Sequence, residues 1–217
     1  MAAAYIFCPS QALNREKINI PENHGDIYIA ADSGITTAFE FNITPDVLIG
    51  DCDSIQTKNI ILPEDNNGIK IIKYPAEKSD TDLMLAVKYA LGLGYKSIII
   101  IGGLDGRTDH TLANLFYLKY IKINGGDGCI TNGYNKITFI SNGIAQIYKN
   151  YKYISVIPVS PELRGVTLTG FRYPLKNACV RFEEPYTISN EISDGLEFGI
   201  IEITEGEALI CECDDVL

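Results

Sequence analysis

Short, almost unbroken apolar runs alternate with helix-like segments from residue 5 to about residue 120. These runs are rich in β-branched residues and lie at 5–8, 27–31, 47–50, 69–74 and 97–101. Parallel strands that are covered on both faces have this character, because neither face needs polar side chains. The pattern therefore predicts an α/β domain with a Rossmann-like parallel sheet and helices packed on it.

Two of the intervening segments have the period of an amphipathic helix. In the first, apolar residues recur at helical spacing and end at a pair of glycines: Leu83, Ala86, Val87, Ala90 and Leu91. Ser79 and Asp82 match the S-x-x-D capping pattern at its start. In the second, the spacing predicts a buried face of Leu112, Leu115 and Phe116, with Lys119 covering its edge by its aliphatic stem.

After about residue 125 the pattern changes to short alternating segments punctuated by glycine, asparagine and tyrosine. Strands at this spacing without intervening helices are typical of an antiparallel β-sandwich. We therefore predict two domains: residues 1–128 form the α/β domain and residues 129–217 form the β-sandwich.

The composition indicates an ordered globular protein, since 46% of the 217 residues are hydrophobic and 21% are charged. The net charge of −10 argues against nucleic acid as a partner, because binding it requires a basic surface. No apolar run approaches the ~20 residues of a membrane helix, and the N-terminus lacks a basic signal-peptide region. We expect a cytoplasmic protein without a membrane partner.

The six cysteines are scattered and no export signal accompanies them, so we expect reduced thiols rather than disulfides. Cys211 and Cys213 alternate along a predicted strand and share one face. Because no second pair stands at zinc spacing, burial is favoured over metal binding.

Acidic residues occur in each of the four loops that follow the second to fifth predicted strands. Because ligands of open parallel sheets bind beyond the carboxyl ends of the strands, these loops are expected to meet in one cleft. Clustered carboxylates repel one another unless a cation is present, and oxygen ligands without a histidine cluster favour Mg²⁺. Mg²⁺ in turn favours a nucleoside polyphosphate as substrate. The acids are Asp32, Asp51, Asp53, Asp80, Asp82, Asp105 and Asp109.

Some of these acids have a structural alternative. Asp53, followed by Ser54, could cap a helix instead of binding metal. Asp82 lies in a predicted first helical turn, where the helix dipole stabilises an acid whether or not it contacts metal. Both interpretations stay open at this point.

The stretch GGLDGRTDHTLAN, residues 102–114, follows a predicted buried strand and combines glycines with charged side chains. Its glycines permit a tight turn whose amides approach phosphate, and a helix beginning near Thr108 directs its positive end to the same place. Arg107 adds a planar fork suited to phosphate oxygens. His110 and Asn114 share a helical face and are expected to face the cleft, although His110 could equally serve the core or a cap.

Several spaced motifs together resemble the thiamine pyrophosphokinase (thiamine diphosphokinase) family. They are ADSG, PDVLIGDCDSI, EKSDTDLMLAV, GGLDGRTDHTLANL, IPVSPELRGVTLTGFRYPL and TISNE, and they cover residues 30–120 and 155–191 in register. The resemblance implies an N-terminal catalytic domain that binds nucleotide and metal, a C-terminal β-sandwich that helps to bind thiamine, and a homodimer with active sites between subunits.

By the same resemblance, the reaction transfers a pyrophosphoryl group from ATP to thiamine and gives thiamine diphosphate and AMP. The implied metal ligands are Asp32, Asp51, Asp53 and Asp82. The expected catalytic residues are Asp80, Asp82, Arg107 and Asp109: Arg107 and Asp109 match the family's R-x-D pair, and either Asp80 or Asp109 could accept the hydroxyl proton. Nucleotide contacts are expected from Ser33, Gly34, Gly103, Arg107, Asp109, His110 and Asn114, and thiamine contacts from Thr187, Ser189 and Asn190.

The sequence departs from the family pattern at two positions. Ser33 stands where the family typically has glycine, and Ser79 stands where an acid is common, with Asp80 one place later. Without tryptophan, stacking on thiamine would need another aromatic ring. Phe171 and Tyr173 are candidates, although core packing is the favoured interpretation of both.

Two other functions use the same features. A magnesium-dependent nucleotide phosphohydrolase would use the aspartates with water as nucleophile and would release phosphate without thiamine. A nonenzymatic nucleotide sensor would bind ATP without turnover and would use its β-domain to bind a protein.

Overall fold

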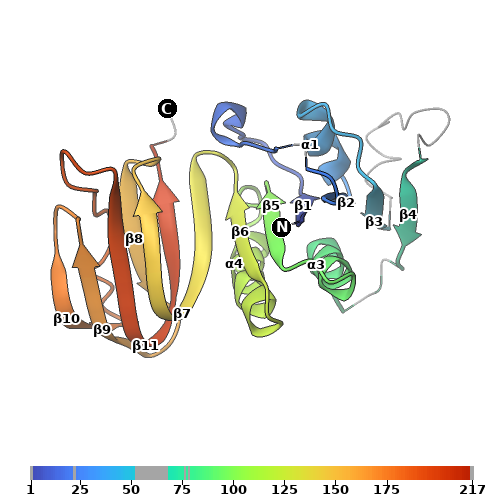
Figure 1. The fold of residues 1–217 in the computed structure, drawn as a ribbon. Helices are drawn as coiled ribbons and strands as arrows, with labels where there is room; N and C mark the ends of the chain where they lie inside the picture. The colour runs from blue at the N-terminus through green and yellow to red at the C-terminus, as the bar shows by residue number, and fades with distance from the viewer. Residues whose placement is uncertain (1, 22, 52–67, 76, 78, 216–217) are drawn as a thin grey trace. The chain divides into compact units, whose positions relative to one another are not determined.

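The computed structural model describes residues 2–21, 23–51, 68–75, 77 and 79–215. The chain divides into two compact units, Met1–Gly133 and Tyr134–Leu217 (Figure 1). The boundary expected from the sequence, between residues 128 and 129, falls inside a strand of the first unit, β6 (Asp127–Thr131).

A parallel sheet forms the centre of the first unit. Its order is β6-β5-β1-β2-β3-β4, and every pair of neighbours is parallel, which confirms the predicted α/β sheet. The remaining strands are β1 (Ala3–Phe7), β2 (Ile27–Ala31), β3 (Val47–Gly50), β4 (Lys70–Lys73) and β5 (Ser97–Ile101). β4 was expected to be buried on both faces, but its residues are exposed or half-buried because it pairs with β3 at the edge of this sheet.

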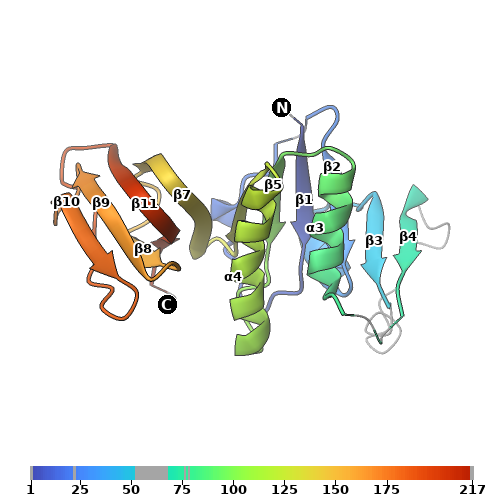
Figure 2. The same ribbon diagram turned by 90° about the horizontal axis from the view of Figure 1, so that it is seen from below.

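Helices cover both faces of this sheet. α3 (Asp82–Gly92) and α4 (Thr108–Ile123) lie on one face and α1 (Gly34–Glu40) on the other; Figure 2 shows α3 and α4 in front of the strands. A 3-10 turn, η1 (Arg15–Lys17), follows β1. α3 buries Leu83, Ala86, Val87 and Ala90, as predicted from their spacing.

The predicted cap of α3 was wrong. Thr81, not Ser79, is the N-cap residue, and its Oγ1 accepts a hydrogen bond from the Met84 amide at 3.2 Å. The S-x-x-D pattern placed the cap two residues too early, because threonine at residue 81 offers the same hydroxyl directly before the helix.

The predicted buried face of α4 was also wrong. Leu112 and Phe116 are 51% and 56% exposed, whereas Leu118 and Ile121 are buried. Gly128 in β6 explains the choice, since a Cβ atom there would lie 2.8 Å from Ile121 Cδ1 and 3.3 Å from Leu118 Cδ2. The helix therefore packs the stripe that fits against a strand without a side chain at this position.

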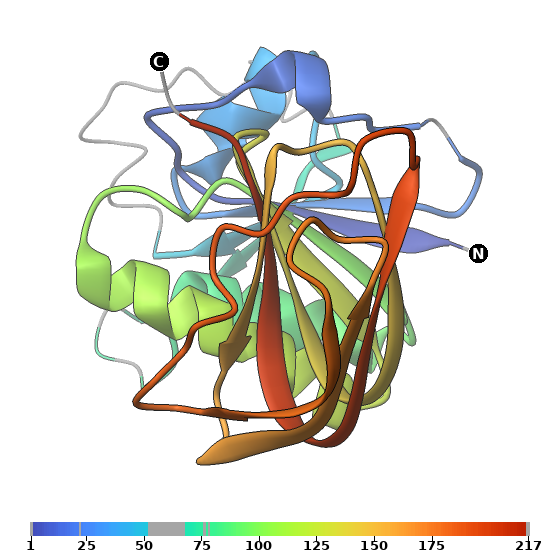
Figure 3. The same cartoon turned by 90° about the vertical axis from the view of Figure 1, so that its left-hand side faces the viewer.

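The second unit is antiparallel throughout, as predicted. Its strands are β7 (Asn135–Tyr148), β8 (Tyr153–Pro158), β9 (Glu162–Thr169), β10 (Leu175–Arg181) and β11 (Phe198–Cys213). β7 and β11 are longer than expected, because each joins two segments that the sequence pattern separates. β11 pairs with β7 along its length, with β9 in its first half and with β8 in its second half, so the strands curl around a core (Figure 3).

The two aromatic candidates for stacking on thiamine differ in their burial. Phe171 is 3% exposed and packs closely enough on β11 that a Cβ atom at Gly199 would lie 2.6 Å from its ring. The core interpretation of Phe171 is therefore confirmed. For Tyr173 it was wrong, because Tyr173 is 60% exposed.

The cysteines of the described part of the chain form no disulfide bonds, as expected: Cys8, Cys129, Cys179, Cys211 and Cys213. Burial raises the pKa of the Cys211 thiol to about 12, with a smaller contribution from Cys213. Cys52 lies outside the described residues. None of the helices in the described ranges has the length and apolar character needed to cross a membrane.

Candidate active site

A cavity of about 470 Å³ lies at the carboxyl ends of the parallel strands. β1 pairs with β2 on one side and with β5 on the other, so the chain reverses its direction across the sheet at this point. Ligands of open α/β sheets bind at such a switch point. The cavity is lined by Cys8, Pro9, Ser10, Gln11, Ala31, Asp32, Thr36, Thr81, Asp82, Leu83, Gly103, Asp105, Gly106, Arg107, His110 and Asn114.

Asp32 is the most unusual residue of this cavity. It follows β2, and its backbone lies in the left-handed region at φ 47°, which residues with a Cβ atom rarely adopt. Its backbone is held by a 2.8 Å hydrogen bond from the Asp32 amide to the Ile49 carbonyl. Its Oδ1 atom is buried and has no hydrogen-bond partner. A buried carboxylate oxygen without a donor is costly to the fold, so it fits a site for a cation or another ligand.

The other expected metal ligands differ in their position. Asp82, in the first turn of α3, lines the same cavity as Asp32. Asp51 directly follows β3, and a Cβ atom at Gly50 would lie 3.2 Å from Asp32 Cα, so the ends of β2 and β3 are close. Asp53 lies outside the described residues. Within the described residues, no three histidine, cysteine or acidic side chains are grouped to hold a metal ion.

The glycine-rich turn after β5 has the predicted conformation. Gly102, Gly103 and Gly106 have φ values of 85°, 72° and 94°, which glycine adopts without strain. α4 begins at Thr108, and the buried Asn114 Nδ2 donates a 2.8 Å hydrogen bond to the Gly103 carbonyl. The helix thereby fixes the turn at one wall of the cavity.

Arg107 and Asp109 form an exposed ion pair. Arg107 Nη2 lies 2.6 Å from Asp109 Oδ2, and Arg107 Nε lies 3.1 Å from Asp109 Oδ1. The hydrogen bond from Arg107 is the main cause that lowers the pKa of the Asp109 carboxyl, and the His110 amide contributes to the same shift. Arg107 and His110 line the cavity, whereas Asp109 is not among the lining residues and is bonded to Arg107.

Three further expected residues are not among those that line the cavity. Asp80 lies at the surface and pairs with Lys88 Nζ at 2.6 Å. Ser33 is the buried N-cap residue of α1. At Gly34 a Cβ atom would lie 2.0 Å from the Phe7 carbonyl oxygen, so this glycine lets α1 pack on β1.

The segment after β1 contributes residues that sequence reasoning did not assign to the site. Cys8, Ser10 and Gln11 line the cavity, and burial raises the pKa of the Cys8 thiol to about 12, with smaller contributions from Asp82 and Asp105. The first strand carries no acid in its loop, so the search for acidic loops passed over it. The position of this loop at a carboxyl end of the sheet was the signal that could have identified it.

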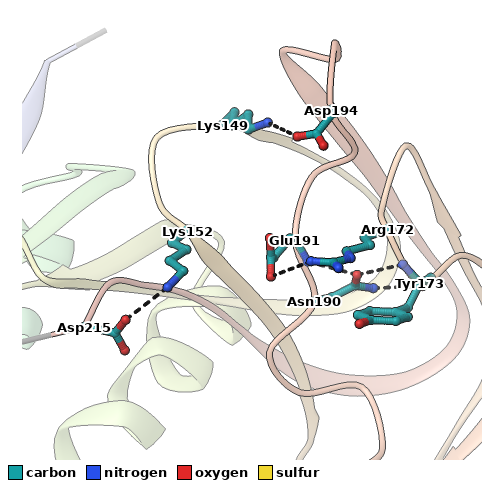
Figure 4. Close-up of polar contacts among 8 residues, drawn as sticks. All are labelled: Lys149, Lys152, Arg172, Tyr173, Asn190, Glu191, Asp194 and Asp215. Carbon is teal, nitrogen blue, oxygen red and sulfur yellow. Dashed lines mark hydrogen bonds and ion pairs between the residues drawn. The ribbon is translucent and has the colours of Figure 1, made fainter.

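In the second unit, Thr187 and Asn190 line a small cavity of about 120 Å³ together with Tyr173 and Tyr186. Asn190 is buried and makes two hydrogen bonds with the backbone of Tyr173: its Oδ1 accepts at 3.0 Å and its Nδ2 donates at 2.8 Å (Figure 4). Thr187 Oγ1 donates to the Val156 carbonyl. These side chains therefore shape the cavity by holding its backbone.

Ser189 has a similar structural task. It lies in the left-handed region at φ 55°, and its amide donates a 3.0 Å hydrogen bond to Ser155 Oγ. Arg172 lies beside this loop, 5.7 Å from the centre of the Tyr173 ring and 3.4 Å from Glu191 Oε1 (Figure 4). Tyr173 is thereby presented at the surface between a fixed backbone and a guanidinium group.

Comparisons with known proteins agree with this geometry. Residues 22–125 match the family described as "Thiamin pyrophosphokinase, catalytic domain", and residues 141–206 match "Thiamin pyrophosphokinase, vitamin B1 binding domain". The thiamine pyrophosphokinase of Bacillus subtilis is 37% identical over 169 residues, which are 76% of this chain and 78% of that protein. The chain belongs to the thiamine pyrophosphokinase family.

Solved structures of this family share the fold. A crystal structure of thiamine pyrophosphokinase from Bacillus subtilis superimposes with a TM-score of 0.86 at 28% identity and covers 99% of both chains. That of thiamin pyrophosphokinase from Geobacillus thermodenitrificans has a TM-score of 0.82 at 26% identity and covers 99% of this chain and 98% of the other. The comparisons lend no support to the nucleotide phosphohydrolase considered from the sequence.

Proposed function

We propose that this protein is a thiamine pyrophosphokinase that transfers the pyrophosphoryl group of ATP to thiamine and releases AMP. The observation that carries the proposal is the cavity at the switch point of the sheet, where the unpartnered Asp32 oxygen, Arg107 and the start of α4 meet. A polyphosphate fits this combination, because glycine amides, a helix N-terminus and a guanidinium group all bind anionic oxygens.

In the proposed reaction, the hydroxyethyl oxygen of thiamine attacks the β-phosphorus of ATP. The bond from the β-phosphorus to the oxygen that bridges it to the α-phosphorus breaks, and AMP leaves with that oxygen. Catalysis of such transfers depends on positioning and on stabilising charge rather than on strong bases. Gly103, His110 and Asn114 would form the nucleotide wall of the cavity, and Arg107 would bind phosphate oxygens.

Mg²⁺ is the proposed metal, with Asp32 and Asp82 as its ligands inside the cavity and Asp51 at the adjoining strand end. When bound, it would neutralise part of the charge on the phosphate oxygens. The buried Oδ1 atom of Asp32 supports this assignment, because this oxygen has no hydrogen-bond partner. Asp53 stays a predicted ligand outside the described residues.

Asp109 is proposed to hold the Arg107 guanidinium in place, since two hydrogen bonds join them. Its lowered pKa makes it a weak acceptor for the thiamine hydroxyl proton, which a loose transition state tolerates. Asp80 stays a prediction as an alternative acceptor, and its ion pair with Lys88 would have to open for that role.

Thiamine is proposed to bind with its thiazolium ring near the exposed Tyr173 and the cavity that Thr187 and Asn190 line. Because the positive thiazolium ring favours the face of an aromatic ring, Tyr173 offers a suitable surface. We also propose a homodimer with active sites between subunits. The division of tasks between a catalytic unit and a thiamine-binding unit, and a cytoplasmic location, belong to the same proposal.

The test is to incubate the purified protein with Mg²⁺ and ATP, with and without thiamine, and to quantify AMP, thiamine diphosphate and inorganic phosphate. The proposal predicts equal amounts of AMP and thiamine diphosphate that form only when thiamine is present. Release of phosphate at the same rate without thiamine would overturn it. Light scattering of the same sample tests the homodimer, which predicts about twice the 23.9 kDa mass of one chain.

A further inference from the structure

Asp105 joins the two loops that meet at the switch point of the sheet. It lies in the turn between β5 and α4, and its carboxylate receives donors from the segment after β1. Ser10 Oγ lies 2.9 Å from Oδ1 and 3.1 Å from Oδ2, and the Ala12 amide donates to Oδ2 at 3.2 Å. The Gln11 amide also donates to Oδ2.

The backbones of the two loops are close together as well. The Gly103 amide donates a 3.2 Å hydrogen bond to the Pro9 carbonyl, and a Cβ atom at Gly102 would lie 2.6 Å from the Cys8 carbonyl oxygen. Asp105 adds side-chain bonds just beyond this contact, where the segment leaves the sheet.

The segment that Asp105 holds also lines the cavity, since Pro9, Ser10 and Gln11 are among its lining residues, as are Arg107 and His110. A carboxylate occupied by several donors from one loop is used differently from Asp32, whose Oδ1 atom has none. The two acids of the same cavity therefore have different tasks.

From these contacts we infer that Asp105 is a positioning residue of the nucleotide site: it fixes residues 10–12, of which Ser10 and Gln11 line the cavity, and does not itself bind the metal. This inference rests on the proposed function for the identity of the nucleotide. The contacts themselves are independent of that function and are tested separately.

The kinetic test compares Asp105→Ala, Asp105→Asn and Ser10→Ala. Asp105→Ala removes every acceptor, so the KM for ATP is expected to rise about tenfold or more while kcat changes little. In Asp105→Asn, the amide oxygen can still accept from the Gln11 and Ala12 amides, and the amide nitrogen can donate to Ser10 Oγ. It is expected to stay within about threefold of the wild type, because most of the hydrogen bonds persist.

Two further results separate positioning from metal binding. The Mg²⁺ concentration for half-maximal activity at saturating ATP is expected to be unchanged in Asp105→Asn, whereas loss of a metal ligand would raise it. As a single substitution, Ser10→Ala is expected to weaken ATP binding. Added to Asp105→Ala, it is expected to have no further effect, because Ser10 and Asp105 act through the hydrogen bond between them.

The contact itself is tested by amide hydrogen exchange, which needs no activity. Exchange at Gln11 and Ala12 is expected to be faster in Asp105→Ala and near the wild-type rate in Asp105→Asn. Asp127→Ala is the matched control, because it removes an exposed carboxylate paired with Lys122 at 2.6 Å at the far end of α4. It should change neither exchange at these amides nor the KM for ATP.

Faster exchange together with a raised KM supports the inference. Unchanged amide exchange or an unchanged KM for ATP in Asp105→Ala would overturn it, and so would a raised Mg²⁺ requirement in Asp105→Asn. If Asp105→Ala fails to fold, Asp105→Asn and Ser10→Ala still decide between the two roles. If the wild-type protein makes no thiamine diphosphate, the proposed function fails while the exchange experiment still tests the contact.

Discussion

Replacing Asp32 by asparagine distinguishes the effect of this side chain on the stability of the fold from its effect on ligand binding. Asp32 lies at φ 47°, and asparagine adopts this left-handed conformation more readily than other residues with a Cβ atom. The substitution therefore keeps the backbone and the side-chain shape. It changes the charge of a group whose Oδ1 atom is buried without a hydrogen-bond partner.

The expected change in stability follows from that unpartnered oxygen. A buried polar atom without a partner costs about 1–3 kcal/mol, and a neutral amide is less costly to bury than a carboxylate. In EDTA, the free energy of unfolding of Asp32→Asn is therefore expected to rise by about 1 kcal/mol, which raises Tm by about 2–4 °C for a chain of this length. At Mg²⁺ tenfold above Kd, the wild type gains about 1.4 kcal/mol and the variant loses this gain.

The assay is thermal unfolding in EDTA and in Mg²⁺, combined with thiamine diphosphate formation. Asp46→Ala is the control, because Asp46 Oδ2 accepts a 2.8 Å hydrogen bond from the Tyr28 amide and is used by the fold. It should lose about 1 kcal/mol in both buffers and keep its activity. The reasoning is refuted if Asp32→Asn is destabilised in EDTA like Asp46→Ala and is stabilised by Mg²⁺ like the wild type.

Three further changes test other parts of the structure. Burial raises the pKa of the Cys8 thiol from 9.0 to about 12, so this thiol contributes stability that is present below pH 9 and is lost as the pH rises toward 12. Iodoacetamide at pH 8 should leave Cys8 unmodified in the folded protein, and modification of Cys8 would contradict its burial. Lys136→Met removes the ion-pair partner that lies 2.7 Å from Glu212, whose side chain is 3% exposed. Urea unfolding should show that the free energy of unfolding falls by about 3 kcal/mol and that adding Glu212→Leu largely restores it. An unchanged urea midpoint of Lys136→Met would refute this. Tyr173→Ala should raise the KM for thiamine about tenfold with little change in stability, and an equal KM would remove Tyr173 from the thiamine site.

The fold could be predicted from the sequence where local pattern and burial coincide. β2, β3 and β5 lie at the predicted residues, because strands that are covered on both faces are formed by nearly continuous apolar runs. The buried face of α4 was missed, because the helix carries two apolar stripes and the buried one is the stripe that packs against Gly128. Such a choice depends on a strand that is distant along the chain.

The candidate site could also be predicted only in part from the sequence. The loops that carry acids could be identified from the sequence, because strand ends and charged residues are both visible in it. The tasks of individual acids could not. Asp32, Asp80 and Asp105 are alike as letters, yet one has a buried unpartnered oxygen, one pairs with Lys88 at the surface and one holds the loop after β1. These differences arise from side chains that only the tertiary structure brings within hydrogen-bond distance.

The central claim is that the cavity at the carboxyl ends of β1, β2 and β5 binds the triphosphate of ATP together with a divalent cation. The most direct measurement is a crystal structure with Mg²⁺ and α,β-methylene ATP, in which the bond that would break cannot be cleaved. The account predicts phosphates beside Arg107 and the turn at 102–106, with the cation against Asp32 Oδ1. Density for the nucleotide elsewhere, with this cavity filled by water alone, would contradict it.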